Sequence, residues 1–388
     1  MPQHLPDYQG GGIANLMSSI AAACGASGSP YPRLSTIDAA VFERARHIVL
    51  LVVDGLGYDY LCSEGAGSNL HGKLAAKLTS VFPSTTASAA TCLLSGHAAQ
   101  QHGLTGWHMY YREVGAVASV LPLTPRHGGP SFGSLGIASE TLLSGTPLFD
   151  RIDCPSHVVA PNHIVDSDFN RYYSGSARRS GYQSLDQCFS LIAENIRSQP
   201  GRSYTHAYYP VIDAASHSFG CRSREVEQRF ARLDQRFASF LEAMAGSDCA
   251  VIVSADHGFI DTPPEHRIEL QSHPELEPML TLPLCGERRV AYCYVHPRHR
   301  ANFTAYVASE FAGRAELMDS EELLARGWFG LGEPHPRLLE RIGDYTLLMQ
   351  DDWTIKDWVM GEQRYEHIGV HGGTSSAEMF VPLILAQC

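Results

Sequence analysis

The sequence predicts an α/β protein with a largely parallel central sheet flanked by helices, and two observations support this prediction. Three apolar runs, at 47–53, 204–212 and 249–255, are continuous rather than alternating, which is typical of strands buried on both faces. The segments between the runs carry apolar residues three and four positions apart, as helices that pack on a sheet do. Strands that alternate with helices in this way favour an α/β fold.

The remaining segments predict how the domain is organised. Helices are expected at 84–94, 185–196 and 226–244. Residues 1–40 are rich in Gly, Ser, Ala and Pro, which predicts an irregular N-terminal arm with one short helix. From 262 to 344, Pro-rich turns surround one expected strand and two short helices. We interpret 262–344 as an inserted, cap-like segment within a single domain of residues 1–388.

Composition limits the classes of protein to which the chain can belong. A hydrophobic content of 44% over 388 residues is enough for a sizeable core. The 29 basic and 41 acidic residues give a net charge of −12. Proteins that bind nucleic acid through phosphates normally carry a basic stripe, whereas the short basic runs here, such as Arg288-Arg289, are interpreted as solvated surface. Nucleic acid is therefore not an expected partner.

The cysteines and the first residues of the chain indicate the cellular compartment in which the protein is expected. The ten cysteines are scattered without a Cys-x-x-Cys pair, and they indicate neither a disulfide framework nor a zinc ribbon. The first 18 residues lack the basic and apolar regions of a signal peptide. The most apolar run is too short to span a bilayer. We expect a cytoplasmic protein without stable membrane insertion.

Acidic residues follow the three apolar runs, and histidines lie near them. The residues are Asp54, Asp213, Asp256, His217, His257 and His371. The carboxyl ends of parallel strands meet at one edge of a sheet, where ligands gather. Carboxylate and imidazole groups suit zinc and related divalent metals, and clustered carboxylates would repel one another without a cation. Each motif alone is more often a turn or a cap, but together they predict a site for two metal ions.

A candidate nucleophile lies in the segment 81–87, which leads into the small-residue helix. A hydroxyl at a helix N-terminus lies beside free backbone N–H groups and the positive end of the helix dipole, a favourable place for a phosphate. The alternative is that Ser84 or Thr85 only caps the helix. The local sequence by itself favours the cap.

Taken together, these motifs resemble the type I phosphodiesterase/nucleotide pyrophosphatase family of the alkaline phosphatase superfamily. The matching motifs are Asp54-Gly55, Phe82 to Thr86, Gly96 with His102-Gly103, Asp213-x-x-x-His217, Ser254 to Gly258, and His371-Gly372-Gly373. The resemblance runs from about residue 47 to 385. It implies an alkaline-phosphatase-like fold and a hydrolase that acts on a small-molecule phosphodiester.

The resemblance also implies roles for individual residues. Asp213, His217 and His371 would hold one divalent metal, and Asp54, Asp256 and His257 would hold the other. Thr86 would be the nucleophile, would bridge toward the second metal, and would form a phospho-threonine intermediate. Metal coordination lowers the pKa of a bound hydroxyl, so that no separate general base is needed. Zinc is the expected metal, with manganese as the alternative.

Two departures from the family pattern concern the substrate. Trp107 lies where nucleotide-hydrolysing members carry an asparagine, and Ala87 follows the nucleophile where a bulky residue is common. Nucleotide specificity is therefore in doubt. Trp107 and Tyr110 are candidates for an aromatic substrate pocket, with ordinary core aromatics as the alternative.

Other activities stay open on the sequence alone. Within the superfamily, the alternatives are a phosphomonoesterase, a phosphonate hydrolase or a phosphomutase. From another class, the chain could be a metal-binding pseudoenzyme or sensor.

Overall fold

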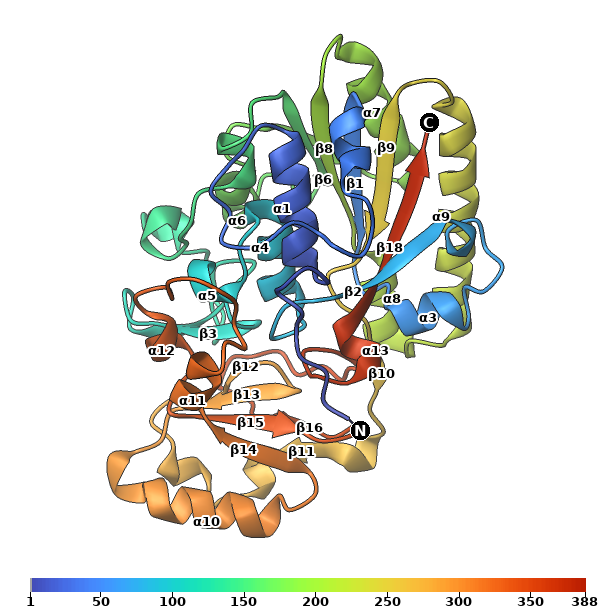
Figure 1. Cartoon of the computed structure of the whole chain (residues 1–388). Helices are drawn as coiled ribbons and strands as arrows, with labels where there is room; N and C mark the ends of the chain where they lie inside the picture. Colours follow the sequence, from blue (N-terminus) through green and yellow to red (C-terminus); the bar gives the residue numbers. More distant parts are fainter. Residues whose placement is uncertain (1) are drawn as a thin grey trace.

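Two seven-stranded sheets organise the computed structural model, which describes residues 2–388 (Figure 1). The strands of the central sheet, in spatial order, are β2 (Leu74–Thr79), β18 (Phe380–Gln387), β9 (Cys249–Ser254), β1 (His47–Val53), β8 (Ser203–Tyr209), β6 (Ser156–Pro161) and β7 (Arg178–Tyr182). Neighbouring strands from β9 to β7 are parallel, and β18 runs antiparallel to both β2 and β9. The prediction of a largely parallel central sheet is confirmed.

Strand register brings three chain segments to the same edge of this sheet. Val53 of β1 pairs with Tyr209 of β8, and Val52 pairs with Ser254 of β9. Every residue of β1 and β9 is buried, as expected for strands covered on both faces. The residues that follow β1, β8 and β9 therefore emerge side by side.

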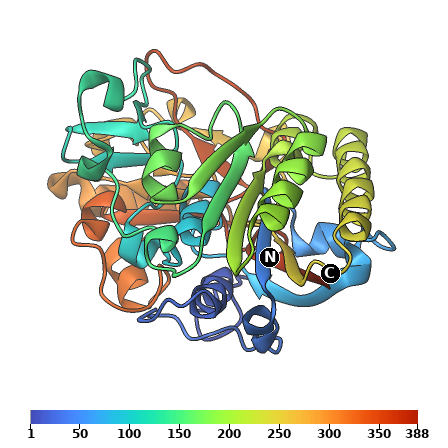
Figure 2. The ribbon, with the colours of Figure 1, turned by 90° about the horizontal axis from the view of Figure 1, so that it is seen from above.

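Helices cover both faces of the central sheet. Helices α1 (Ile13–Ala23) and α4 (Thr86–Ser95) pack together on one face, and α7 (Leu185–Ser198) and α9 (Arg224–Ala243) lie on the other (Figure 2). The apolar stripe of α9, including Phe230, Leu233 and Phe237, is buried. The buried α1 makes the N-terminal arm part of the helical layer.

A second sheet lies below the central one in Figure 1, and all of its neighbouring strands are antiparallel. In spatial order its strands are β14 (Ala315–Asp319), β15 (Tyr345–Met349), β13 (Val290–Cys293), β12 (Cys285–Gly286), β3 (His108–Tyr111), β4 (Ala116–Ser119) and β5 (Thr124–Pro125). Residues 262–344 supply β12, β13 and β14, together with α10 (Arg300–Glu310) and α11 (Ser320–Ala325). That this segment is an inserted cap stays a prediction.

Shorter elements complete the chain. They are α2 (Ala40–Arg44), α3 (Tyr58–Cys62), α5 (Ala99–His102), α6 (Asp168–Ser174), α8 (Val211–Phe219), α12 (Leu338–Arg341), α13 (Ser376–Met379) and two strand pairs, β10 (Ile260–Asp261) with β17 (Gly369–Val370) and β11 (Arg267–Glu269) with β16 (Thr354–Lys356). Within residues 2–388, no helix combines the length and the apolar character needed to cross a membrane.

Candidate active site

The six predicted metal ligands gather at the edge of the central sheet where β1, β8 and β9 end. Asp54 directly follows β1, and Asp256 and His257 follow β9. The strand predicted at 204–212 ends at Tyr209, so Asp213 lies in the first turn of α8 rather than at a strand end. Because residues four apart share one helix face, α8 still presents Asp213 and His217 together.

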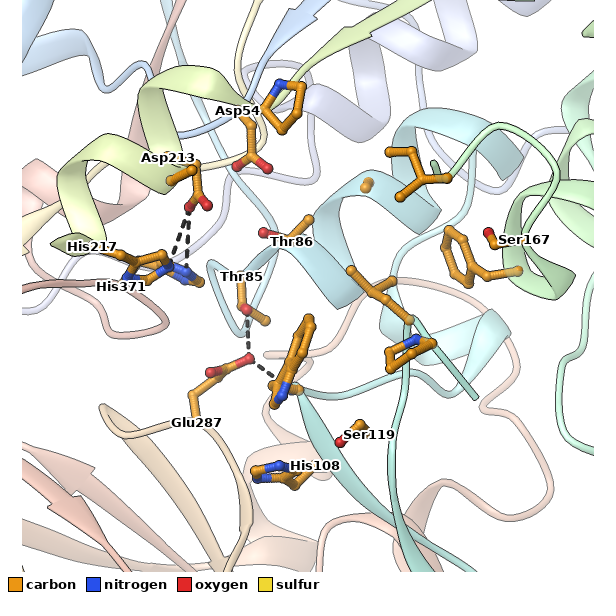
Figure 3. Close-up of a pocket in the computed structure, with 18 of the residues that line it drawn as sticks. Asp54, Thr85, Thr86, His108, Ser119, Ser167, Asp213, His217, Glu287 and His371 are labelled. Carbon is orange, nitrogen blue, oxygen red and sulfur yellow. Dashed lines mark hydrogen bonds and ion pairs between the residues drawn. The ribbon is translucent and has the colours of Figure 1, made fainter. Parts of the chain in front are cut away.

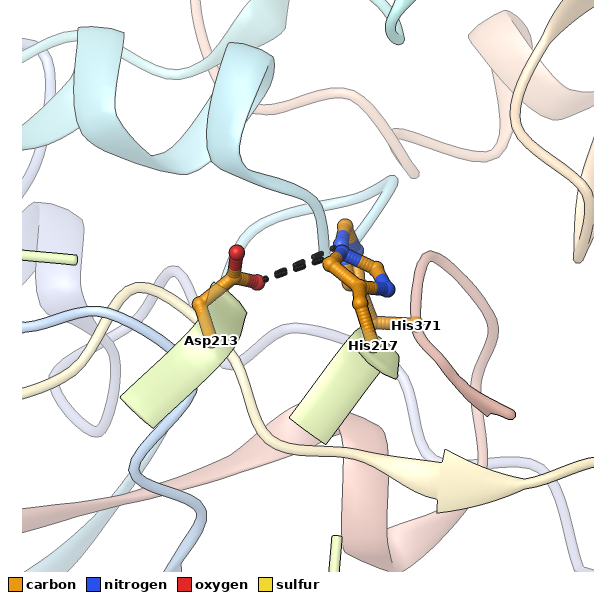
Figure 4. Close-up of side chains that lie close together, drawn as sticks. All are labelled: Asp213, His217 and His371. Atoms are coloured by element: carbon orange, nitrogen blue, oxygen red, sulfur yellow. Dashed lines mark ion pairs between the residues drawn. The ribbon is translucent and has the colours of Figure 1, made fainter. Parts of the chain in front are cut away.

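The first cluster consists of Asp213, His217 and His371, one potential ligand atom of each lying within 4.8 Å of the others (Figure 4). Asp213 Oδ1 is 3.4 Å from Nε2 of His217 and 3.8 Å from Nε2 of His371. The Nδ1 atom of His217 lies 2.8 Å from the carbonyl oxygen of Gly369. A proton on Nδ1 that donates to this carbonyl leaves the Nε2 lone pair free for a metal.

The second cluster consists of Asp54, Asp256 and His257 and meets the same 4.8 Å limit. His257 Nε2 is 3.4 Å from Asp54 Oδ1 and 3.5 Å from Asp256 Oδ2. Its Nδ1 lies 3.0 Å from the Gly258 carbonyl, so a proton on Nδ1 again leaves Nε2 unprotonated. All three residues are buried.

The chemistry of both clusters fits a cation. Asp54 Oδ1, Asp213 Oδ1 and Asp256 Oδ2 are buried and accept no hydrogen bond from the described residues. Burial and the neighbouring carboxylates raise the pKa values of Asp54 and Asp213 well above the usual range. Burial lowers the pKa of His217 to about 4, so its imidazole is neutral, the form that binds metals. Buried carboxylate oxygens without a hydrogen-bond donor are costly unless a metal neutralises them.

Thr86 lies at the first position of α4, beside the second cluster. Its Oγ1 is 3.1 Å from His257 Nε2, and Figure 3 shows the hydroxyl turned toward Asp54 and Asp213. The free backbone N–H groups at the start of α4 lie next to it. The hydroxyl therefore adjoins both potential metal ligands and a favourable place for an anion.

The neighbouring hydroxyls have other partners. Thr85 occupies the N-cap position of α4, but its side chain makes no capping hydrogen bond and donates instead to Glu287 Oε1 at 2.6 Å. Ser84 donates to the carbonyl of Gly373 at 2.7 Å, which ties this segment to the loop that carries His371. Thr85 therefore occupies the cap position that the local sequence favours, but neither hydroxyl makes a capping hydrogen bond.

Sequence reasoning missed two polar residues of the site. The Tyr208 hydroxyl, from β8, donates to Asp54 Oδ2. Glu287, in the turn between β12 and β13, accepts hydrogen bonds from Thr85 and from the backbone N–H of Trp107 at 2.7 Å. Burial raises the pKa of Glu287 to about 7. Tyr208 precedes Asp213 by five residues and could have been suspected, whereas nothing in the sequence near Glu287 indicates the site.

A cavity of about 1220 Å³ adjoins the clusters and reaches Ser167 (Figure 3). Trp107 lines this cavity, as its candidate role requires. Tyr110 is not among the lining residues, and its ring packs edge-on against Tyr294 in the core of the second sheet, at a centroid distance of 5.8 Å. The structure thus favours the core interpretation for Tyr110.

The basic pair Arg288-Arg289 is not solvated surface, which corrects the interpretation from sequence. Arg289 is 2% exposed and forms an ion pair at 3.0 Å with the buried carboxylate of Glu378. Arg288 lines the cavity. Arg289 is therefore buried in an ion pair, whereas Arg288 is half-buried at the wall of the cavity.

Comparison with solved structures places the fold among known hydrolases. Mouse ectonucleotide pyrophosphatase/phosphodiesterase 5 is 17% identical, with a TM-score of 0.65 and 87% of each chain covered. A second structure of the mouse protein, 16% identical with a TM-score of 0.64 and 87% of each chain covered, is of an inactive threonine-to-alanine variant in complex with AMP. Phosphonoacetate hydrolase from Sinorhizobium meliloti, in complex with phosphonoformate, is 16% identical, with a TM-score of 0.62 and coverages of 88% of this chain and 90% of that chain. No curated protein sequence matches the chain significantly.

The alkaline-phosphatase-like fold and the family match together define a hydrolase of the alkaline phosphatase superfamily. The family model of the type I phosphodiesterases/nucleotide pyrophosphatases matches residues 48–374, and the chain belongs to this family.

Proposed function

We propose that the chain is a two-metal phosphodiester hydrolase with Thr86 as its nucleophile. The observation that supports this most directly is the position of the Thr86 hydroxyl, 3.1 Å from His257 Nε2 and at the N-terminus of α4. The similar mouse protein whose threonine-to-alanine variant is inactive adds support. An intact threonine and a complete ligand set argue against the alternative of a metal-binding pseudoenzyme or sensor.

The two clusters would hold one divalent ion each. Asp213, His217 and His371 form the more histidine-rich set, and Asp54, Asp256 and His257 form the other. Ligand sets of Asp and His without Cys suit zinc, with manganese as the alternative. When bound, the pair of ions would supply the positive charge that lowers the pKa of the nucleophile and stabilises both sides of the displacement.

Residues of the chain would then carry out the displacement. The Thr86 hydroxyl loses its proton as its oxygen bonds to phosphorus, and the ester bond to the leaving alcohol breaks as the leaving oxygen gains a proton. The resulting phospho-threonine is hydrolysed by water, which restores the Thr86 hydroxyl. Backbone N–H groups of α4 face the phosphoryl oxygens. The hydrogen bonds that Glu287 accepts from Thr85 and Trp107 fix the adjoining wall of the cavity. Through this turn, the segment 262–344 would close one side of the site.

The substrate we propose is a small-molecule phosphodiester, with a phosphonate as the alternative. The family match favours the diester, and the similarity to phosphonoacetate hydrolase supports the alternative. Trp107 is the aromatic residue that we expect to contact the substrate.

Comparison of matched esters tests this proposal. We expect a higher kcat/KM for methyl 4-nitrophenyl phosphate than for 4-nitrophenyl phosphate under identical zinc loading. A monoester preference of tenfold or more, about 1.4 kcal/mol of transition-state binding, would replace the diesterase with the phosphomonoesterase alternative. Phosphonoacetate as the only substrate hydrolysed would replace it with a phosphonate hydrolase.

A further inference from the structure

Arg288 differs from the other cations around the cavity because no carboxylate neutralises it. Arg126 is paired with Asp357 at 2.6 Å and with Glu362 at 3.0 Å, and Lys356 is paired with Glu362 at 2.6 Å. Within residues 2–388, no carboxylate oxygen lies within the 4.0 Å ion-pair distance of the Arg288 guanidinium. Its hydrogen-bond acceptor is the Tyr365 carbonyl, at 3.1 Å.

A chain of ring contacts connects Arg288 to the first metal-ligand cluster. The guanidinium carbon of Arg288 lies 5.1 Å from the ring centroid of Tyr365. The Tyr365 ring is 4.6 Å from that of His367, which in turn is 4.0 Å from the ring of His217. All four side chains line the same cavity. Arg288 therefore lies on the His217 side of the site.

An unpaired guanidinium in this position is suited to bind an anion. A half-buried charge without a paired counter-ion has lost part of its hydration, and the Tyr365 carbonyl and ring replace only part of that loss. A planar guanidinium supported by aromatic rings presents a fork that matches a carboxylate or a phosphate. The chain carries a net charge of −12, so a free cation inside the cavity would draw an anionic group to this position in particular.

We propose that Arg288 binds a second anionic group of the substrate, a carboxylate or a phosphate, on the His217 side of the reacting phosphorus. This inference rests on the proposed function. It narrows the substrate class to phosphodiesters, or phosphonates in the alternative, that carry a negative charge away from the bond that breaks. Arg288 is then a specificity-determining residue and takes no part in the bond changes.

Three methyl aryl phosphates that differ only in the 4-substituent of the leaving phenol test the proposal. Their leaving phenols carry a 4-carbamoyl group, which is neutral, a 4-carboxylate, or a 4-phosphonate, so the last two distinguish the possible anions. We expect kcat/KM for at least one charged ester to exceed that for the carbamoyl ester tenfold or more. Arg288→Gln should lower this ratio tenfold or more, and Arg288→Lys, which keeps the charge but loses the fork, should restore part of it. Arg44→Gln, an exposed arginine, should leave the ratio unchanged.

The ratio of kcat/KM for the charged ester to that for the carbamoyl ester distinguishes a loss of anion binding from structural damage. A disturbed fold would lower kcat/KM for both esters and leave their ratio unchanged. Calorimetric binding of the same esters to Thr86→Ala protein gives a readout that needs no turnover. In the Thr86→Ala protein, we expect the charged ester to bind tenfold more tightly than the carbamoyl ester. Adding Arg288→Gln should abolish this difference in affinity. Equal rates and equal affinities for charged and neutral esters in the wild-type chain, or a ratio that survives Arg288→Gln, would overturn the inference. If the esters bind with the expected ratio but none is hydrolysed, the proposed function fails and the role of Arg288 stands.

Discussion

Thr85 and Thr86 are adjacent, yet their hydroxyls have different surroundings, and this difference makes the nucleophile assignment testable. Thr86 adjoins His257, whereas Thr85 donates to Glu287. We expect Thr86→Ala to lower kcat for the methyl aryl diester at least about a thousandfold, because the attacking oxygen is lost. Thr85→Ala should stay within about tenfold of the wild type. If Thr85→Ala is the inactive variant, the two roles must be exchanged.

Glu287 makes a pH-dependent contribution to stability, and its sign follows from the raised pKa. Burial raises the pKa of Glu287 from 4.5 to about 7. A raised pKa means that the folded chain binds the proton more tightly, so the contribution is full below pH 4.5 and is lost as the pH rises through 7. In metal-free protein, we expect the unfolding free energy of the wild type, relative to Glu287→Gln, to fall by roughly 1–3 kcal/mol across this window.

Urea unfolding of the two chains at several pH values measures this difference. Because Asp54 and Asp213 are present in both chains, their own titration largely cancels. If the unfolding free energy of the wild type minus that of Glu287→Gln stays constant or rises between pH 4.5 and 7, Glu287 does not have the raised pKa that its burial implies.

At the scale of elements, the loop that carries His371 depends on a buried ion pair between two layers of the molecule. Arg289, from the turn between β12 and β13, pairs with Glu378 of α13, which also accepts hydrogen bonds from Gly373 N at 2.8 Å and from the Ser375 hydroxyl at 2.6 Å. Removing one partner leaves the other charge buried and unpaired. We expect Glu378→Gln to lower the free energy of unfolding by about 3–5 kcal/mol.

An exposed pair provides the matched control for this substitution. Arg33 and Glu43 lie 2.5 Å apart with side chains that are 58% and 46% exposed. Glu43→Gln should cost less than about 1 kcal/mol in the same urea experiment. Equal losses for the two variants would show that the Arg289–Glu378 pair does not hold the loop.

The sequence predicted the elements that local pattern determines. The uniformly apolar runs located β1 and β9, and thereby Asp54, Asp256 and His257 at one sheet edge. The predicted strand before Asp213 is too long at its C-terminal end. Val211 and Ile212 continue the apolar run in the sequence, but in the structure they begin α8. Glu287 and Arg288 could not be predicted as site residues from the sequence, because their roles come from contacts between distant parts of the chain. The hydrogen bond between Thr85 and Glu287, for example, spans 202 positions.

At the scale of the whole molecule, the metal ligands come from four separate stretches of the chain, so metal binding and folding are linked. Ions that bind only the folded state stabilise it by about 2.7 kcal/mol per site at a free concentration 100 times the Kd. We therefore expect a chelator to lower the Tm and zinc to restore it. His217→Ala should reduce the bound metal from two ions to one per chain and kcat/KM by at least hundreds-fold.

Metal content by mass spectrometry and Tm by calorimetry check this expectation. His71→Ala is the control, since His71 belongs to neither cluster and does not line the cavity. Full activity in metal-free protein, or two ions retained by His217→Ala, would contradict the ligand assignment.

The position of β18 in the central sheet has a consequence for truncated chains. β18 is the last strand in sequence, yet it lies between β2 and β9, and within residues 2–388 no other strand pairs with β2, which otherwise forms only an isolated bridge to Gly12. A chain that stopped before residue 380 would leave β2 without a partner strand and would expose one side of β9 as an open row of N–H and C=O groups. Such rows are templates for strands of other molecules. Early termination would therefore convert a hydrolase into an aggregation-prone fragment before it affected any catalytic residue.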